Sequence, residues 1–162
     1  MSADDDARSR QPRDASPHYA SDLDITLVND LRELARVGAA INDLCHREQV
    51  PHRIGYAVNL SIEEILTCMI SQGASEGDET RRIELALYLD EDQIEVLLAS
   101  EGPPLADVEL PQATLRSSAP QHLLDKARLE QLGLFLVHQV MDEVAFEHRQ
   151  DCNVVVMAKR LS

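Results

Sequence analysis

Hydrophobic and polar positions follow several distinct periodicities along the chain. A short apolar and β-branched run from Leu23 to Val28 predicts a strand. Apolar residues then recur at helical spacing from Leu31 up to a break at Pro51. A second apolar stripe at helical spacing predicts another helix over about 52–72, ending near Gly73.

Two local motifs bear on where these helices begin. Asn29 and Asp30 offer an N-cap for the first helix, and Glu33, three residues after Asp30, completes a capping box. Ser61 and Glu64 have the same spacing and would begin a new helix at that point. The pattern therefore leaves open whether the second helical stretch is one helix or two.

Branched apolar residues then recur at every second position in two neighbouring segments, 83–89 and 94–98, separated by the turn Asp90-Glu91-Asp92. This pattern predicts an antiparallel hairpin. Residues 100–120 contain four prolines and read as a loop. The remaining predicted elements are a short polar helix near 121–130, a helix Leu134–Met141, and strands at about 143–148 and 153–160.

The order of these elements predicts an α+β two-layer sandwich, with a mainly antiparallel sheet and helices gathered on one face. The 162 residues suit one core, and we expect a single domain over 22–162. Residues 1–21 mix Asp, Arg, Ser, Pro and Ala without apolar periodicity, which predicts a disordered tail.

The charge and cysteine content narrow the classes of partner and compartment. A net charge of -14 repels phosphate backbones and anionic lipid, so neither nucleic acid nor membrane is expected as a partner. Three widely spaced cysteines, Cys45, Cys68 and Cys152, argue against a disulfide framework and fit a reducing compartment. The start of the chain lacks a basic, apolar leader. We therefore expect a cytoplasmic protein.

Three segments resemble the nucleotide-binding boxes of a known family. They are Leu60–Cys68, Leu98–Pro104 and Leu129–Asp142. In this order they are similar to the boxes of the anti-sigma factor and serine kinase branch of the GHKL ATPases. The resemblance covers about residues 23–161. It implies the two-layer fold named above and the use of ATP with Mg²⁺ where the site is functional.

In the first segment, Glu64 aligns with the family's glutamate, which would act as the candidate catalytic base. Residues at i and i+4 share one helical face, so the position four residues after Glu64 would hold Mg²⁺. The family has asparagine there, whereas this chain has Cys68. A thiol is a poor ligand for a hard cation, which puts the metal bridge in doubt.

In the second segment, Ser100 occupies the place of the aspartate that reads adenine in the family. Strand parity predicts that Ser100 faces the buried side, with Ile94 and Val96. Gly102 remains from the family's motif. Because Gly-Pro-Pro after a strand is also an ordinary turn, Gly102 has a structural explanation as well.

In the third segment, the family's Gly-Gly-Leu-Gly is replaced by Glu130-Gln131-Leu132-Gly133. The side chain of Gln131 obstructs the close backbone approach that a glycine would permit. Gly133 and Leu134 would begin a helix whose N–H groups form a natural anion site. We interpret Cys68, Ser100, Gly102, Gln131, Leu132, Gly133 and Leu134 as a vestigial nucleotide site.

The resemblance implies a regulator of the partner-switching type, which binds a sigma factor or an anti-sigma factor antagonist and forms homodimers in some relatives. We expect a protein-binding module with weak or absent ATP binding; the alternative is a divergent serine/threonine protein kinase. A structural or dimerisation domain stays open as a third class. Cys45, His46 and His52 lack a second metal-binding pair, and no metal site is expected. His138 fits a helix-surface histidine better than a phosphoacceptor.

Overall fold

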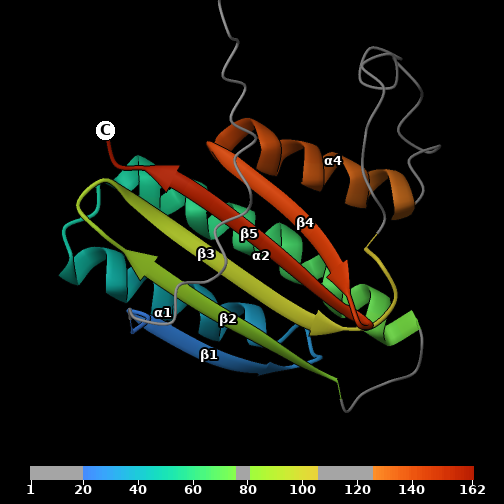
Figure 1. Ribbon diagram of the computed structural model, residues 1–162. Coiled ribbons are helices and arrows are strands. Elements are labelled where there is room, and N and C mark those ends of the chain that lie inside the picture. The colour runs from blue at the N-terminus through green and yellow to red at the C-terminus, as the bar shows by residue number, and fades with distance from the viewer. Residues whose placement is uncertain (1–19, 76–80, 106–125) are drawn as a thin grey trace, which may run out of the picture.

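The computed structural model describes residues 20–75, 81–105 and 126–162. Five strands form one antiparallel sheet in the order β1-β2-β3-β5-β4. The helices α1, α2 and α4 all lie on one face of that sheet (Figure 1). The elements are β1 (Leu23–Val28), α1 (Glu33–Arg47), α2 (His52–Ser75), β2 (Arg82–Leu89), β3 (Gln93–Glu101), α4 (Lys126–Val140), β4 (Glu143–Arg149) and β5 (Cys152–Arg160). The expected α+β two-layer sandwich is confirmed.

Parts of the sequence-based interpretation fall outside the described residues. The predicted tail lies there up to residue 19, and so do residues 106–125, which hold most of the expected loop and the start of the expected polar helix. At the other side of the tail boundary, Asp22 already belongs to the fold. Its N–H donates to the carbonyl of Leu87 at 2.8 Å, and its Oδ2 accepts the N–H of Leu89 at 2.6 Å.

The hairpin of β2 and β3 has the register that its alternation predicts. Leu85 pairs with Leu98 and Leu87 with Val96, so the apolar sets of both strands reach the same face. Asp90 closes the turn, because its Oδ1 accepts the backbone N–H groups of the second and third residues after it, at 2.7 and 2.8 Å. An aspartate that bonds its own downstream backbone is a favoured turn residue.

The predicted capping box at the start of α1 is wrong. Asp30 does not cap the helix; its Oδ1 accepts the N–H of Arg32 at 2.9 Å, and its Oδ2 accepts from the guanidinium at 2.6 Å. The hydrogen bond to the Arg32 side chain is the main reason that the pKa of Asp30 is lowered. Glu33 is the first helical residue and pairs with Arg36 at 2.6 Å. The carboxylates of Asp30 and Glu33 therefore pair with nearby arginines instead of capping backbone N–H groups. The spacing of the motif does not reveal this competition.

The stretch 52–72 forms one helix, not two, and continues to Ser75. Ser61 is fully buried inside α2 and therefore does not begin a new helix. Val58, Ile62 and Leu66, all buried, carry the apolar stripe through this point. The capping-box spacing at Ser61 is incidental.

The third helix differs most from expectation. α4 begins at Lys126 and runs without a break through Gly133 to Val140, whereas the sequence predicts two helices that meet near that glycine. A glycine in a helix interior costs only ~1 kcal/mol relative to alanine, which tertiary packing readily offsets. Gly133 is therefore in the middle of a helix, and the N-terminal anion site expected there is wrong.

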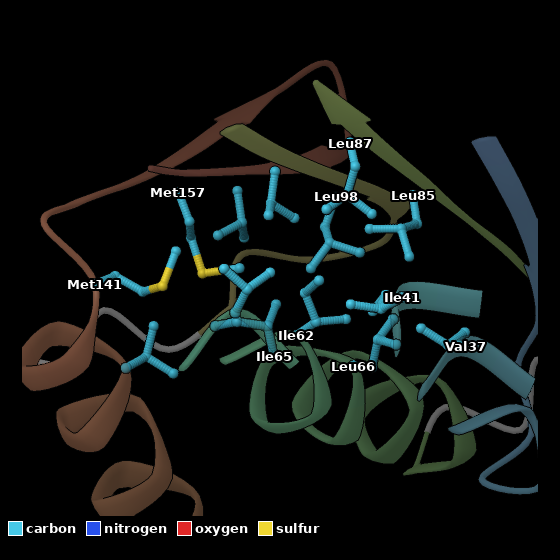
Figure 2. Close-up of a cluster of buried hydrophobic side chains, with 14 of the residues drawn as sticks. Val37, Ile41, Ile62, Ile65, Leu66, Leu85, Leu87, Leu98, Met141 and Met157 are labelled. Carbon is cyan, nitrogen blue, oxygen red and sulfur yellow. The ribbon is translucent and has the colours of Figure 1, made fainter. Parts of the chain in front are cut away.

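The core lies between the sheet and the helices. Figure 2 shows Val37 and Ile41 of α1 and Ile62, Ile65 and Leu66 of α2 pointing toward side chains of the sheet. All are buried, so the helical and alternating patterns of the sequence meet in one hydrophobic layer. No helix in the described parts of the chain has the length and apolar character needed to cross a membrane.

Candidate functional site

The first site element is one face of α2. Glu64 and Cys68 are one turn apart on this helix, as predicted, and Gln72 lies one turn further along the same face. Cys68 is buried and belongs to the hydrophobic core, which confirms the interpretation of its thiol as a small buried hydrophobic group. The face therefore begins with a carboxylate, passes a buried thiol and ends with an amide.

Glu64 lies directly against α4. A Cβ built on Gly133 would be 3.0 Å from Cδ of Glu64 and nearer still to Oε2, so only glycine allows this approach as it stands. Gly133 is buried. The third sequence segment therefore contacts the first one, as the resemblance implies. The contact is made by the Glu64 carboxylate, which packs on the backbone of α4.

The surroundings of Glu64 favour its neutral form. Burial raises the pKa of the Glu64 carboxyl, and the neighbouring charge of Glu63 raises the same pKa further. A raised pKa makes this carboxylate a stronger proton acceptor than an ordinary glutamate. The group that the sequence singles out as a base is thus the one acid in the described site with this kind of perturbation.

Ser100 is buried on β3, as strand parity predicts, with 4% of its surface exposed. Its register partners are Ile83 on β2 and Asn153 on β5. Asn153 has only 3% of its surface exposed, so two small polar side chains occupy neighbouring core-facing positions at this end of the sheet.

Side chains on β5 and α2 form hydrogen bonds with the backbone of the turn after β3. Asn153 on β5 donates from Nδ2 to the carbonyl of Pro103 at 2.8 Å and accepts at Oδ1 the N–H of Leu105 at 2.9 Å. Gln72 on α2 donates from Nε2 to the carbonyls of Pro103 at 3.0 Å and Pro104 at 3.2 Å. The backbone of the Gly-Pro-Pro turn is therefore bonded within the protein itself.

Gly102 shows why the turn needs a glycine. Its φ is +142°, a conformation that side chains disfavour, and a Cβ there would lie 2.7 Å from Nη1 of Arg81. Its N–H donates to the carbonyl of Asp151 at 2.7 Å, and its own carbonyl accepts from Nε2 of His148 at 2.8 Å. The structural explanation of Gly102 is thus sufficient.

The other predicted site residues lie close together on α4 but differ in exposure. Leu134 is buried in the core, whereas Leu132 is partly exposed. Gln131 belongs to α4, and its side chain lies outside the described part of the structure. His138 is exposed, with its ring centroid 6.0 Å from that of Phe146 on β4, in agreement with a helix-surface histidine.

Sequence reasoning missed Gln72, His148 and Asn153. For Asn153 a signal was present, because it shares the core-facing parity of Val155 and Met157, and an amide at such a position needs hydrogen-bond partners. For Gln72 and His148 no local signal exists. Their role depends on the turn that another part of the chain brings to them.

The residues at this site do not fit the mode in which the family resemblance places ATP with Mg²⁺. The position for a metal-binding amide holds the buried thiol of Cys68, and the turn beside the adenine position is already hydrogen-bonded to Gln72 and Asn153. Within the described residues, no group of three or more His, Cys, Asp or Glu side chains is placed to hold a metal ion.

Curated relatives of this chain are serine-protein kinases. It is 27% identical to the serine-protein kinase RsbW of Bacillus subtilis over 113 residues, in an alignment that covers 66% of this chain and 69% of that protein. The serine-protein kinase RsbW of Bacillus licheniformis is 27% identical over 101 residues, 59% of this chain. The chain spans only 62% of the length of that second relative.

Two solved structures share the fold. One contains the RsbU and RsbW domains of Rv1364c from Mycobacterium tuberculosis, with a TM-score of 0.58, 15% identity, and coverage of 86% of this chain and 32% of that one. The other is the SiaB-SiaC complex from Pseudomonas aeruginosa, with a TM-score of 0.59, 14% identity, and coverage of 86% and 90%. At these identities the similarity concerns the fold.

The match to a protein family is the broadest of these findings. Residues 27–159, which include α1, both boxes on α2 and β3, and α4, match the histidine kinase-like ATPase domain. Since this range covers most of the chain, the protein belongs to the family of histidine kinase-like ATPase domains.

Proposed function

We propose that this protein is a cytoplasmic regulator of a bacterial partner-switching pathway, which binds a protein partner and binds ATP weakly or not at all. The partner is a sigma factor or an anti-sigma factor antagonist. The family supports this class of function, since relatives carry the name serine-protein kinase RsbW and a protein of the same fold is found in the SiaB-SiaC complex.

The hydrogen-bonded turn at Gly102 is the observation that carries the proposal of weak ATP binding. Its backbone groups already have partners in Gln72, His148 and Asn153, so a ligand would have to replace bonds rather than complete them. Replacing a bond between protein groups yields little net free energy, whereas satisfying an unpaired group yields ~1–3 kcal/mol.

Cys68 adds to this argument. Losing one charge-assisted hydrogen bond costs ~1.5–3 kcal/mol, and a micromolar site is worth only ~8 kcal/mol in all. By the resemblance, Ser100 removes one such hydrogen bond, and Cys68 removes a metal ligand, which weakens ATP binding further. Together with Gln131, they would place ATP binding in the millimolar range or weaker.

A divergent serine/threonine protein kinase is the second candidate, and the raised pKa of Glu64 favours it. In that case the Glu64 carboxylate would accept the proton of a substrate hydroxyl. The two candidates differ in a measurable way, because a kinase needs nucleotide and a binding module does not.

Partner binding with and without nucleotide tests the proposal. Purified antagonists and sigma factors from the same organism would be titrated into the protein by calorimetry, in the presence and absence of ATP and Mg²⁺. We expect one of them to bind with an affinity that nucleotide leaves unchanged. Transfer of labelled phosphate from ATP to a serine of the antagonist would establish the kinase instead. Light scattering of the free protein tests the expected homodimer.

A further inference from the structure

A cavity lies at the end of the fold opposite to Cys68 and Gly102. It has a volume of about 430 Å³ and sits between the first turns of α2, the end of α4, and the neighbouring ends of β4 and β5. Arg53, which lines it, and Cys68 are roughly 22 Å apart along α2 at ~1.5 Å per residue. The cavity is therefore separate from the candidate nucleotide site.

Cationic side chains dominate the polar lining of this cavity. Arg53, Lys159 and Arg160 face a single acidic side chain, that of Asp142. Among the side chains that line the cavity, cations therefore outnumber anions by three to one. This local excess is unusual in a chain whose net charge is -14.

The cations are available for a further anionic partner. Lys159 and Arg160 share the carboxylate of Asp142 at 3.8 and 3.6 Å, longer than a close ion pair. Asp142 stays ionised, because the backbone N–H of Arg160 bonds its Oδ2 at 2.7 Å and lowers its pKa. Arg53 is exposed and forms no ion pair with any described residue.

Apart from Gln139 and Ser162, the rest of the lining is apolar or aromatic. Ile54, Ala57 and Val140 are apolar residues of the lining, and Tyr56 is 65% exposed beside them. Tyrosine and arginine are the side chains most enriched among residues that dominate protein-protein binding energy. An apolar floor with an aromatic ring and cationic side chains suits an apolar side chain flanked by carboxylates.

The exposure of these groups points to a peptide rather than an enclosed metabolite. Pockets for small molecules bury most of the ligand surface, whereas the guanidinium side chain of Arg160 is itself 70% exposed. We propose that this cavity, lined by Arg53, Tyr56, Lys159 and Arg160, docks an acidic segment of a protein partner. The inference rests on the proposed function only in that the partner is a protein.

A peptide titration tests the docking site. The probe is the peptide Asp-Glu-Leu-Phe-Glu-Asp, titrated into the ¹⁵N-labelled full chain and followed by amide chemical shifts. We expect the largest changes at Arg53, Tyr56, Lys159 and Arg160. A peptide with Ser-Ser in place of Leu-Phe should bind at least about tenfold more weakly, which corresponds to ~1.4 kcal/mol.

Matched variants locate the effect. Arg53→Glu should weaken binding of the peptide about tenfold or more, and its exposed position without an ion pair predicts an unchanged melting temperature. Arg160→Gln and Tyr56→Ala should weaken it too. Arg149→Glu makes the same charge reversal as Arg53→Glu at the far end of the sheet, where Arg149 is 73% exposed, and should leave binding unchanged.

Several outcomes would overturn the inference. They are the absence of shift changes at millimolar peptide, equal weakening by Arg149→Glu, and equal shifts with inorganic phosphate alone, which would indicate a simple anion site. If Arg53→Glu binds a purified antagonist or sigma factor with wild-type affinity, the docking inference fails while the proposed function stands. If no such protein binds but the peptide does, the proposed partner class fails and the docking site stands.

Discussion

The carboxylate of Glu64 on α2 packs against the backbone of Gly133 on α4, closer than any side chain at position 133 would permit. This contact joins two helices at the point where the sequence resemblance places the reacting end of a nucleotide site. A side chain at position 133 would require the Glu64 carboxylate to move. The first two predictions concern this contact.

The first prediction is that substitutions at Gly133 and Glu64 are strongly coupled. Gly133→Ala gains helix propensity but displaces the Glu64 carboxylate, so we expect no stabilisation of the wild-type protein. In a Glu64→Ala background the same change should stabilise by ~0.5–1 kcal/mol, giving a coupling of about 1 kcal/mol. Urea unfolding of the four proteins measures it.

Gly38→Ala is the matched control, because the nearest atoms to a Cβ on Gly38 lie 3.7 Å away, an ordinary contact. This change should stabilise α1 by ~0.5–1 kcal/mol in either background. Additive effects of Gly133→Ala and Glu64→Ala would show that the two residues do not touch in solution.

The second prediction concerns pH. Because burial and Glu63 raise the pKa of Glu64, the folded state holds its proton more tightly than the unfolded state. The stability that protonated Glu64 contributes is fully present below its ordinary pKa and is lost as pH rises through the raised folded value. Glu64→Gln should therefore unfold at higher denaturant than wild type at pH 8, and the difference should shrink toward pH 4.5.

Glu63→Gln supplies the control for the pH effect. It removes the charge that is the second cause of the shift, so it should lower the pKa of Glu64 without abolishing the shift from burial. Carbon-13 NMR of the Glu64 carboxyl measures the pKa directly. A Glu64 pKa at or below that of free glutamate would refute the buried environment.

The third prediction is that Asn153 holds the turn after β3. Asn153→Ala leaves the carbonyl of Pro103 and the N–H of Leu105 without this partner, and it should destabilise by about 1–3 kcal/mol. Asn59→Ala, which removes an exposed side-chain hydrogen bond of 3.3 Å to Asn42, should cost less than ~0.5 kcal/mol. Equal costs for the two changes would contradict the role of Asn153.

The fourth prediction is that the nucleotide site can be restored. The triple change Cys68→Asn, Ser100→Asp and Gln131→Gly should produce measurable ATP binding, since each change restores a contact or the clearance that the resemblance implies. Calorimetry compares it with the wild-type protein. A well-folded triple variant that still binds no ATP would show that the bonded turn at Gly102 closes the site on its own.

The framework of this fold was predictable because it depends on local periodicity. The strand Leu23–Val28 has the bounds that its apolar run predicts, and the hairpin from β2 to β3 follows from strict alternation on both sides of an acidic turn. In both cases the neighbouring residues alone decide which face is buried. The family resemblance agreed with these patterns.

The errors arose where partners distant in sequence decide the outcome. Asp30 pairs with the Arg32 side chain instead of forming the predicted capping box. Gly133 was predicted to be a helix boundary because the sequence does not show its packing against Glu64. The network of Gln72 and Asn153 around Pro103 joins residues about thirty to fifty positions apart. Such contacts appear only once the sheet and helices are assembled.

A titration of the wild-type protein with ATP and Mg²⁺ tests the central claim most directly. Calorimetry should give a dissociation constant weaker than about 1 mM, and the melting temperature should not rise at 1 mM nucleotide. A ligand at one hundred times its dissociation constant stabilises by ~2.7 kcal/mol, so tight binding could not escape notice. A dissociation constant in the low micromolar range would contradict the account and establish a working nucleotide site.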